Sequence, residues 1–84
     1  MGELSKLPNI GKAVEEQLNQ VGIDTVEQLK EAGSKQAWLR IKGIDESACI
    51  NRLYVLEGAI QGIRWHDLSD DAKSELKEFF SRYK

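Results

Sequence analysis

The chain has 84 residues, of which 40% are hydrophobic and 31% charged, and its formal net charge is −2. We expect one domain over residues 1–84, because a chain of this length folds around a single small core. The slightly acidic balance argues against a strongly basic nucleic-acid binder and leaves room only for a local basic patch. No apolar run approaches the roughly 20 residues that span a bilayer, and residues 1–6 lack the apolar region of a secretion signal. A cytoplasmic protein without membrane contact is the expectation.

Residues 7–12 (LPNIGK) form a turn that opens the first predicted helix. Pro8 disfavours helix at Leu7, and Gly11 permits a close approach to the main chain. Unpaired N–H groups at a helix start suit a phosphate oxygen. The turn resembles the hairpin of helix-hairpin-helix DNA-binding proteins, which usually reads Gly-hydrophobic-Gly, and Asn9 stands in place of the first glycine. The alternative is that the turn only caps the helix and packs Ile10 inward.

Apolar spacing and capping signals predict five main helices in an all-α domain with short connections. The first spans Lys12 to Val21, and the second follows Thr25, which opens a capping box with Gln28. We expect the second helix to end at Gly33 and a third to begin at Ser34. The remaining expected helices run from Ser47, or from Asp45, to Gly62 and from Ser69 to about Tyr83. No segment shows the alternation of a strand.

The residues suited to catalysis or metal binding are too few to predict an enzyme, a metal site or a cofactor. Cys49 and His66 are the single cysteine and histidine, whereas a zinc site needs three or four ligands. Cys49 lies on the apolar stripe of the fourth predicted helix and is expected in the core. Residues 65–67 (WHD) are interpreted as a structural connector with Trp65 buried.

Two positions in the predicted helices carry structural expectations. Glu15, with other acids of the first two helices, is expected on a solvated outer face. Gly58 lies inside the fourth predicted helix, where glycine costs about 1 kcal/mol relative to alanine. We therefore expect Gly58 to allow close packing against a neighbouring helix. Its neighbour Glu57 is expected to reach Arg40 or Arg64.

Several segments resemble the C-terminal domain of TfoX/Sxy proteins over nearly the whole chain. The most specific are residues 56–60 (LEGAI) and 64–66 (RWH), and the weaker ones include residues 7–11 (LPNIG), 21–23 (VGI) and 37–39 (AWL). The resemblance implies a helical, helix-hairpin-helix-like domain. Longer family members are bacterial regulators that promote competence gene expression and carry a separate N-terminal domain, for which these 84 residues have no room. The hairpin is also similar to a Pro-Asn-hydrophobic-Gly-Lys segment of the bacterial RNA polymerase α C-terminal domain.

The leading hypothesis is a non-catalytic module of transcription regulation that binds the backbone of double-stranded DNA through its hairpin. The expected contact residues are Lys6, Asn9, Ile10, Gly11 and Lys12. Backbone N–H groups and the two lysines would meet phosphates without reading bases. The alternative is a protein-interaction module that contacts transcription proteins or associates with itself.

Overall fold

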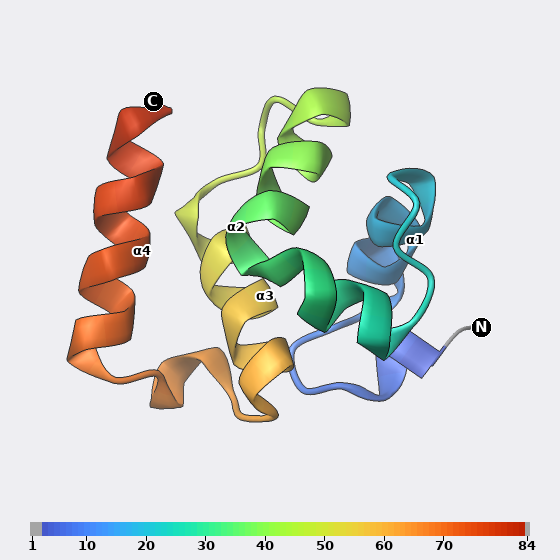
Figure 1. The fold of residues 1–84 in the computed structure, drawn as a ribbon, viewed down its shortest axis with the longest axis horizontal. Coiled ribbons are helices and arrows are strands. Elements are labelled where there is room, and N and C mark those ends of the chain that lie inside the picture. The colour runs from blue at the N-terminus through green and yellow to red at the C-terminus, as the bar shows by residue number, and fades with distance from the viewer. Residues whose placement is uncertain (1–2, 84) are drawn as a thin grey trace.

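The computed structural model describes residues 3–83 and contains only helices in that range. Figure 1 shows α2 and α3 in the middle, with α1 on one side and α4 on the other. The elements in chain order are η1 (Glu3–Lys6), α1 (Lys12–Gln20), α2 (Val26–Ile44), α3 (Ile50–Gln61), η2 (Trp65–Asp67) and α4 (Asp70–Arg82), where η denotes a short 3-10 helix. The predicted all-α class is confirmed. Within these residues no helix is long and apolar enough to cross a membrane.

The described residues form four α-helices rather than the predicted five, because the second and third predicted helices are joined as α2. Gly33 has φ 84° and ψ 160°, which interrupts the helix as a kink. The chain resumes helical geometry directly afterwards, so no loop separates the two halves. Ser34 does not begin a separate helix, as the sequence suggested, but lies inside α2. It is 4% exposed and its Oγ donates to Oε1 of Glu57 at 2.6 Å.

The core lies between α2 and α3 and also takes in the N-terminal elements. Its largest fully buried side chains are Leu4, Leu18, Ile23, Leu29, Trp38, Ile41, Leu53 and Leu56. Trp38 is 0% exposed, and its Nε1 donates to the carbonyl of Cys49 at 3.1 Å. That bond satisfies the indole N–H inside the apolar core and ties α2 to the start of α3.

Helix α3 begins later than expected, and Cys49 is exposed rather than buried. Asp45 accepts hydrogen bonds from the backbone N–H and the Oγ of Ser47, which holds residues 45–47 in a turn. Cys49 is therefore the extended N-cap of α3, with φ −105° and ψ −179°, instead of a member of its inward stripe. The prediction of a core cysteine was wrong because apolar spacing does not fix where a helix starts.

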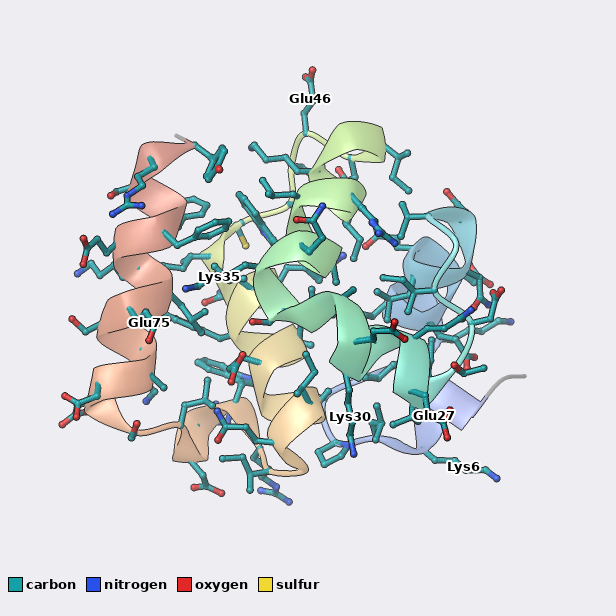
Figure 2. The ribbon with its side chains drawn as sticks, viewed as in Figure 1. Lys6, Glu27, Lys30, Lys35, Glu46 and Glu75 are labelled. Carbon is teal, nitrogen blue, oxygen red and sulfur yellow. The ribbon has the colours of Figure 1, made fainter. Side chains whose placement is uncertain are left out.

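Helix α4 packs on the rest of the domain mainly through aromatic rings. The rings of Phe79 and Phe80 approach Trp38 edge-on, with centroid distances of 6.1 and 5.5 Å. On the solvent side Lys35 Nζ lies 2.7 Å from Oε1 of Glu75, and Figure 2 shows this pair between α2 and α4. Ser69 caps the helix by accepting from the N–H of Ala72 at 3.1 Å, as the sequence predicted.

Candidate nucleic-acid interface

Residues 7–11 connect η1 to α1 through two successive turns. Leu7 N donates to the Leu4 carbonyl at 3.0 Å, and Ile10 N donates to the Leu7 carbonyl at 3.4 Å. Ile10 is 5% exposed and packs into the core, as the structural alternative required. The Ile10 side chain therefore anchors the turn to the core, while the next residue, Gly11, is exposed at the surface.

Asn9 fastens this turn to the connection that follows α3. Its Nδ2 donates to the Ile63 carbonyl at 3.0 Å, and its Oδ1 accepts from the Trp65 N–H at 3.2 Å. Asn9 has φ 71°, a left-handed conformation in which asparagine is strongly enriched relative to most residues. Its amide is directed toward Ile63 and Trp65, so its role in this interface is to position the turn.

Gly58 leaves the space that these contacts occupy. A Cβ added at Gly58 would lie 2.6 Å from Asn9 Nδ2, 2.9 Å from the Ile63 oxygen and 3.0 Å from Trp65 Cα. Close packing at Gly58 was expected, but the partner is a side chain and a loop rather than a neighbouring helix. The sequence separation of these groups explains why no local pattern identified them.

Glu15 holds the other end of the same segment. It is only 5% exposed, and its Oε2 accepts from the backbone N–H of Ser5 at 3.1 Å. The expectation of a solvated outer position was wrong, because a carboxylate can be buried where it accepts a hydrogen bond from the main chain. The segment from Ser5 to Gly11 is thus bonded to α1 at one end and to the connection after α3 at the other.

The start of α1 is exposed and has no side-chain cap. Gly11 is the N-cap, with φ −95° and ψ −177°, and makes no side-chain cap hydrogen bond to the first turn. Gly11, Lys12 and Ala13 are exposed. The N–H groups of a first helical turn have no intrahelical partner and carry partial positive charge. The main chain here can therefore receive an anionic oxygen.

The structure separates the five expected contact residues into two groups. Lys6, Gly11 and Lys12 are exposed, whereas Asn9 is half-buried and Ile10 is buried. Figure 2 shows Lys6 directed into solvent at the lower edge of the molecule, with Glu27 and Lys30 on the same edge. The exposed three are available to a ligand, and the other two shape the turn that presents them.

Sequence reasoning missed the connection at residues 62–67 as a neighbour of the turn. Trp65 is half-buried rather than buried, and it stacks on Tyr54 with centroids 6.0 Å apart and an interplanar angle of 11°. His66 is exposed and stacks on Trp65 at 3.9 Å. The one available signal was an asparagine that follows Pro8, a type that favours left-handed turns and side-chain-to-backbone bonds.

In the part of the chain whose side chains are described, residues 4–83, no group of three or more His, Cys, Asp and Glu side chains is arranged to hold a metal ion. Glu57 does not reach an arginine, because its oxygens accept from Ser34 and from Gln61 Nε2 at 2.6 Å. The fold and this surface together define a small all-helical domain with an exposed, lysine-flanked turn.

Comparison with known proteins places the domain. The TfoX C-terminal domain model matches residues 1–80, and the chain belongs to that family. It is 37% identical over 76 residues to Protein Sxy of Escherichia coli K12, which covers 90% of this chain and 36% of Sxy. The chain thus spans about a third of the length of this curated relative. The resemblance to TfoX/Sxy proteins is confirmed.

Two crystal structures from Listeria monocytogenes share the fold. One, of an uncharacterized protein in a triclinic form, has a TM-score of 0.94 and 54% identity, covering 95% of this chain and 91% of that one. The other, of a protein of unknown function in a tetragonal form, has a TM-score of 0.94 and 53% identity, covering 96% and 99%. The near-complete coverage of those chains shows that the same helical unit has been crystallised.

Proposed function

We propose that this domain is a non-catalytic regulatory module that contacts DNA phosphates through the turn at residues 6–12. Membership of the TfoX C-terminal domain family supports a module of the competence-regulator kind. The chain corresponds to 36% of Sxy, so a competence role of the whole relative enters only as part of this proposal. Transcription regulation is the process in which such a module would act.

The observation that carries the proposal is the N-terminus of α1 without a side-chain cap, with exposed lysines at positions 6 and 12 of the same chain segment. The N-cap Gly11 has no side chain that could bond the first-turn N–H groups, and the acid of that turn, Glu15, is buried and accepts from the Ser5 N–H. Among residues 4–83, whose side chains the structure describes, the ion pairs are Lys35–Glu75 and Arg82–Glu78, so neither Lys6 nor Lys12 is paired there. Main-chain donors would fix one phosphate oxygen while the lysines neutralise its charge and that of a neighbouring phosphate. Such contacts orient a protein on duplex DNA without reading its sequence.

The test is binding of random-sequence duplex DNA over a series of salt concentrations. Lys12→Gln should weaken binding for every sequence and flatten the slope of log affinity against log salt by about 0.9, as expected for one lost phosphate contact. Lys77→Gln is the matched control, because Lys77 is an exposed lysine on α4. If the unmodified protein shows no salt-dependent affinity for duplex DNA, the proposal is wrong.

The alternative of a protein-interaction module is favoured by two exposed apolar side chains. Ile44 is 50% exposed at the end of α2, and Tyr83 is 46% exposed after α4. Exposed apolar groups commonly mark contact sites when they form a patch. Sedimentation equilibrium at rising concentration distinguishes self-association, which Ile44→Glu should weaken, from a domain that stays monomeric.

A further inference from the structure

We infer that Arg64 is a second cationic contact of the same phosphate-binding surface, and that Asn9 is the residue that positions it there. This inference rests on the proposed function and extends it from the N-terminal turn to the connection after α3. The surface would then combine segments more than fifty residues apart, since Asn9 bonds Ile63 and Trp65 at sequence separations of 54 and 56. No local sequence motif contains such a surface.

The position of Arg64 follows from its two neighbours. Asn9 bonds the carbonyl of Ile63 and the N–H of Trp65, so the residue between them has its main chain beside the turn. Arg64 is itself the N-cap of η2, with φ −69° and ψ 144°, and its carbonyl accepts from Asp67 N at 2.9 Å. Its main chain is held on both sides and its side chain is exposed.

The underlying packing fixes this arrangement further. The connection lies directly over Gly58, where a Cβ would be only 2.9 Å from the Ile63 oxygen and 3.0 Å from Trp65 Cα. Trp65 is in turn stacked on Tyr54 of α3. A flexible loop would lose conformational entropy on binding. The main chain of this connection is already ordered by its contacts, so binding through Arg64 would cost it little more entropy.

The charge of Arg64 is free for a ligand in the described structure. Among the side chains described, those of residues 4–83, the guanidinium of Arg64 has no ion pair, since those present join Lys35 to Glu75 and Arg82 to Glu78. The nearest acid along the chain is Asp67, whose N–H donates to the Arg64 carbonyl, and Asp70 and Asp71 lie in the first turn of α4. A guanidinium can bind phosphate through two parallel N–H donors, which makes arginine suited to nucleic-acid backbones.

The ribbon in Figure 1 is consistent with a surface that combines the two segments. The segment between η1 and α1 and the connection after α3 both run along the lower edge of the molecule. Figure 2 places Lys6 and Lys30 on that edge too, with the carboxylate of Glu27 close by. Residues 6–12 and 62–67 contain the exposed cations Lys6, Lys12 and Arg64 and one exposed acid, Asp67.

The experiment compares Arg64→Gln with Arg40→Gln in the binding assay with random duplex DNA. Arg40 is the matched control, since it is also an exposed arginine but lies with Gly22 and Ile23 at the opposite end of α1. Arg64→Gln should weaken binding about tenfold, as for loss of a charge-assisted hydrogen bond, and flatten the salt slope by about 0.9. Arg40→Gln should leave both unchanged.

Asn9 is tested by combining Asn9→Gly with Arg64→Gln. If Asn9 places Arg64 on the surface, Arg64→Gln should weaken binding less in the Asn9→Gly background than in the unmodified protein, because interacting residues are not additive. A purely structural Asn9 would give additive effects, which overturns its positioning role. Circular dichroism checks folding, and the Arg64 comparison stands alone should Asn9→Gly fail to fold.

The outcomes separate this inference from the proposed function. If Lys12→Gln weakens binding and Arg64→Gln does not, the role of Arg64 is overturned while the proposed function stands. Equal effects of Arg64→Gln and Arg40→Gln would indicate a general charge effect and would also overturn it. If the unmodified protein shows no salt-dependent binding, both the proposed function and this inference are wrong.

Discussion

Asn9 combines a left-handed main chain with an amide that is bonded at both ends. Asparagine tolerates φ 71° better than most residues, and its amide supplies a donor and an acceptor that match the Ile63 carbonyl and the Trp65 N–H. Glycine could adopt the same main chain but would make neither bond. Asparagine at this position of the turn therefore has its own structural reason.

We predict that the free energy of unfolding is highest for the unmodified protein, lower for Asn9→Gly and lowest for Asn9→Ala. Both variants lose two hydrogen bonds, each with a net contribution of about 0.5–1.5 kcal/mol. Alanine would in addition be strained in the left-handed main-chain conformation of this position, at a cost of about 1–2 kcal/mol. Urea unfolding followed by circular dichroism measures the three free energies. An alanine variant as stable as the glycine variant would contradict the explanation from backbone strain.

Gly58 gives a second prediction at the scale of one residue. Gly58→Ala should destabilise the domain by about 1–3 kcal/mol, because overpacking of main-chain atoms cannot be relieved by a rotamer change. Alanine's better helix propensity, worth about 1 kcal/mol, offsets only part of this loss. Thermal unfolding measures the effect.

Gly43→Ala is the control for Gly58→Ala. Gly43 also lies in a helix, but nothing is within 4 Å of a Cβ placed there. The exchange should raise stability by about 0.4–1 kcal/mol, since it restricts the unfolded chain. If both exchanges stabilised the domain, the close approach at Gly58 would have no energetic role.

At the scale of elements, α2 shows what a helix gains from an internal kink. The Gly33 interruption redirects the second half of the helix, and the next residue, Ser34, is buried against Glu57 of α3. In that second half Trp38 is buried between α3 and the rings of α4. The kinked helix as a whole contacts α1 and, through Trp38, the aromatic rings of α4.

We predict that Gly33→Ala lowers the melting temperature although space for a methyl group exists. Nothing lies within 4 Å of a Cβ at Gly33, so a clash is absent. The cause would be φ 84° with ψ 160°, a region that is essentially restricted to glycine and costs other residues about 1–3 kcal/mol. Differential scanning calorimetry measures the shift, and an unchanged melting temperature would mean that α2 straightens without loss.

Local signals predicted most element boundaries but not the contacts between distant segments. Thr25 forms the expected capping box, with Gln28 N donating to its Oγ1 at 3.1 Å and the Gln28 amide accepting from Thr25 N. Ser69 caps α4 as expected. Such caps depend on residues three positions apart, so the sequence displays both partners.

The errors concern residues whose partners lie elsewhere. Glu15 is buried because its carboxylate, on α1, accepts a hydrogen bond from the N–H of Ser5 in η1. Helical periodicity cannot predict such a bond between two elements. Cys49 is exposed because a turn at Asp45 and Ser47 delays α3. For the candidate site, the exposed lysines could be identified from the sequence. The hydrogen bonds of the Asn9 side chain could not, because they depend on Gly58 and Ile63.

At the scale of the whole molecule, a polar network joins α1, the end of α2 and α3. Gln17 Nε2 donates to Oδ2 of Asp45 at 2.8 Å, and Arg52 donates to Gln17 Oε1. Hydrogen bonds from the Ser47 side chain, then from Gln17, lower the pKa of Asp45 below its ordinary value. The ionised carboxylate is therefore the form that the folded chain favours.

This network predicts how stability depends on pH. Because the folded pKa of Asp45 is depressed, its contribution is fully present above the unfolded value of about 4 and is lost as pH falls through the folded pKa. The stability difference between the unmodified protein and Asp45→Asn should thus shrink on acidification below about pH 4. Urea unfolding at neutral and acidic pH measures this difference. A constant difference would show that the ionised form has no special role.

The Asn9 contacts also have a consequence for the order of folding. They close a loop of more than fifty residues, with separations of 54 and 56, and contacts this distant form only after the entropy of loop closure has been overcome. Formation of α1, α2 and α3 shortens the effective loop, so we expect the two hydrogen bonds of Asn9 to form late in folding. A growing or partly unfolded chain would then carry the lysines without the arranged surface. Under the proposed function, the complete surface would exist only in molecules in which residues 62–67 have already folded onto the turn.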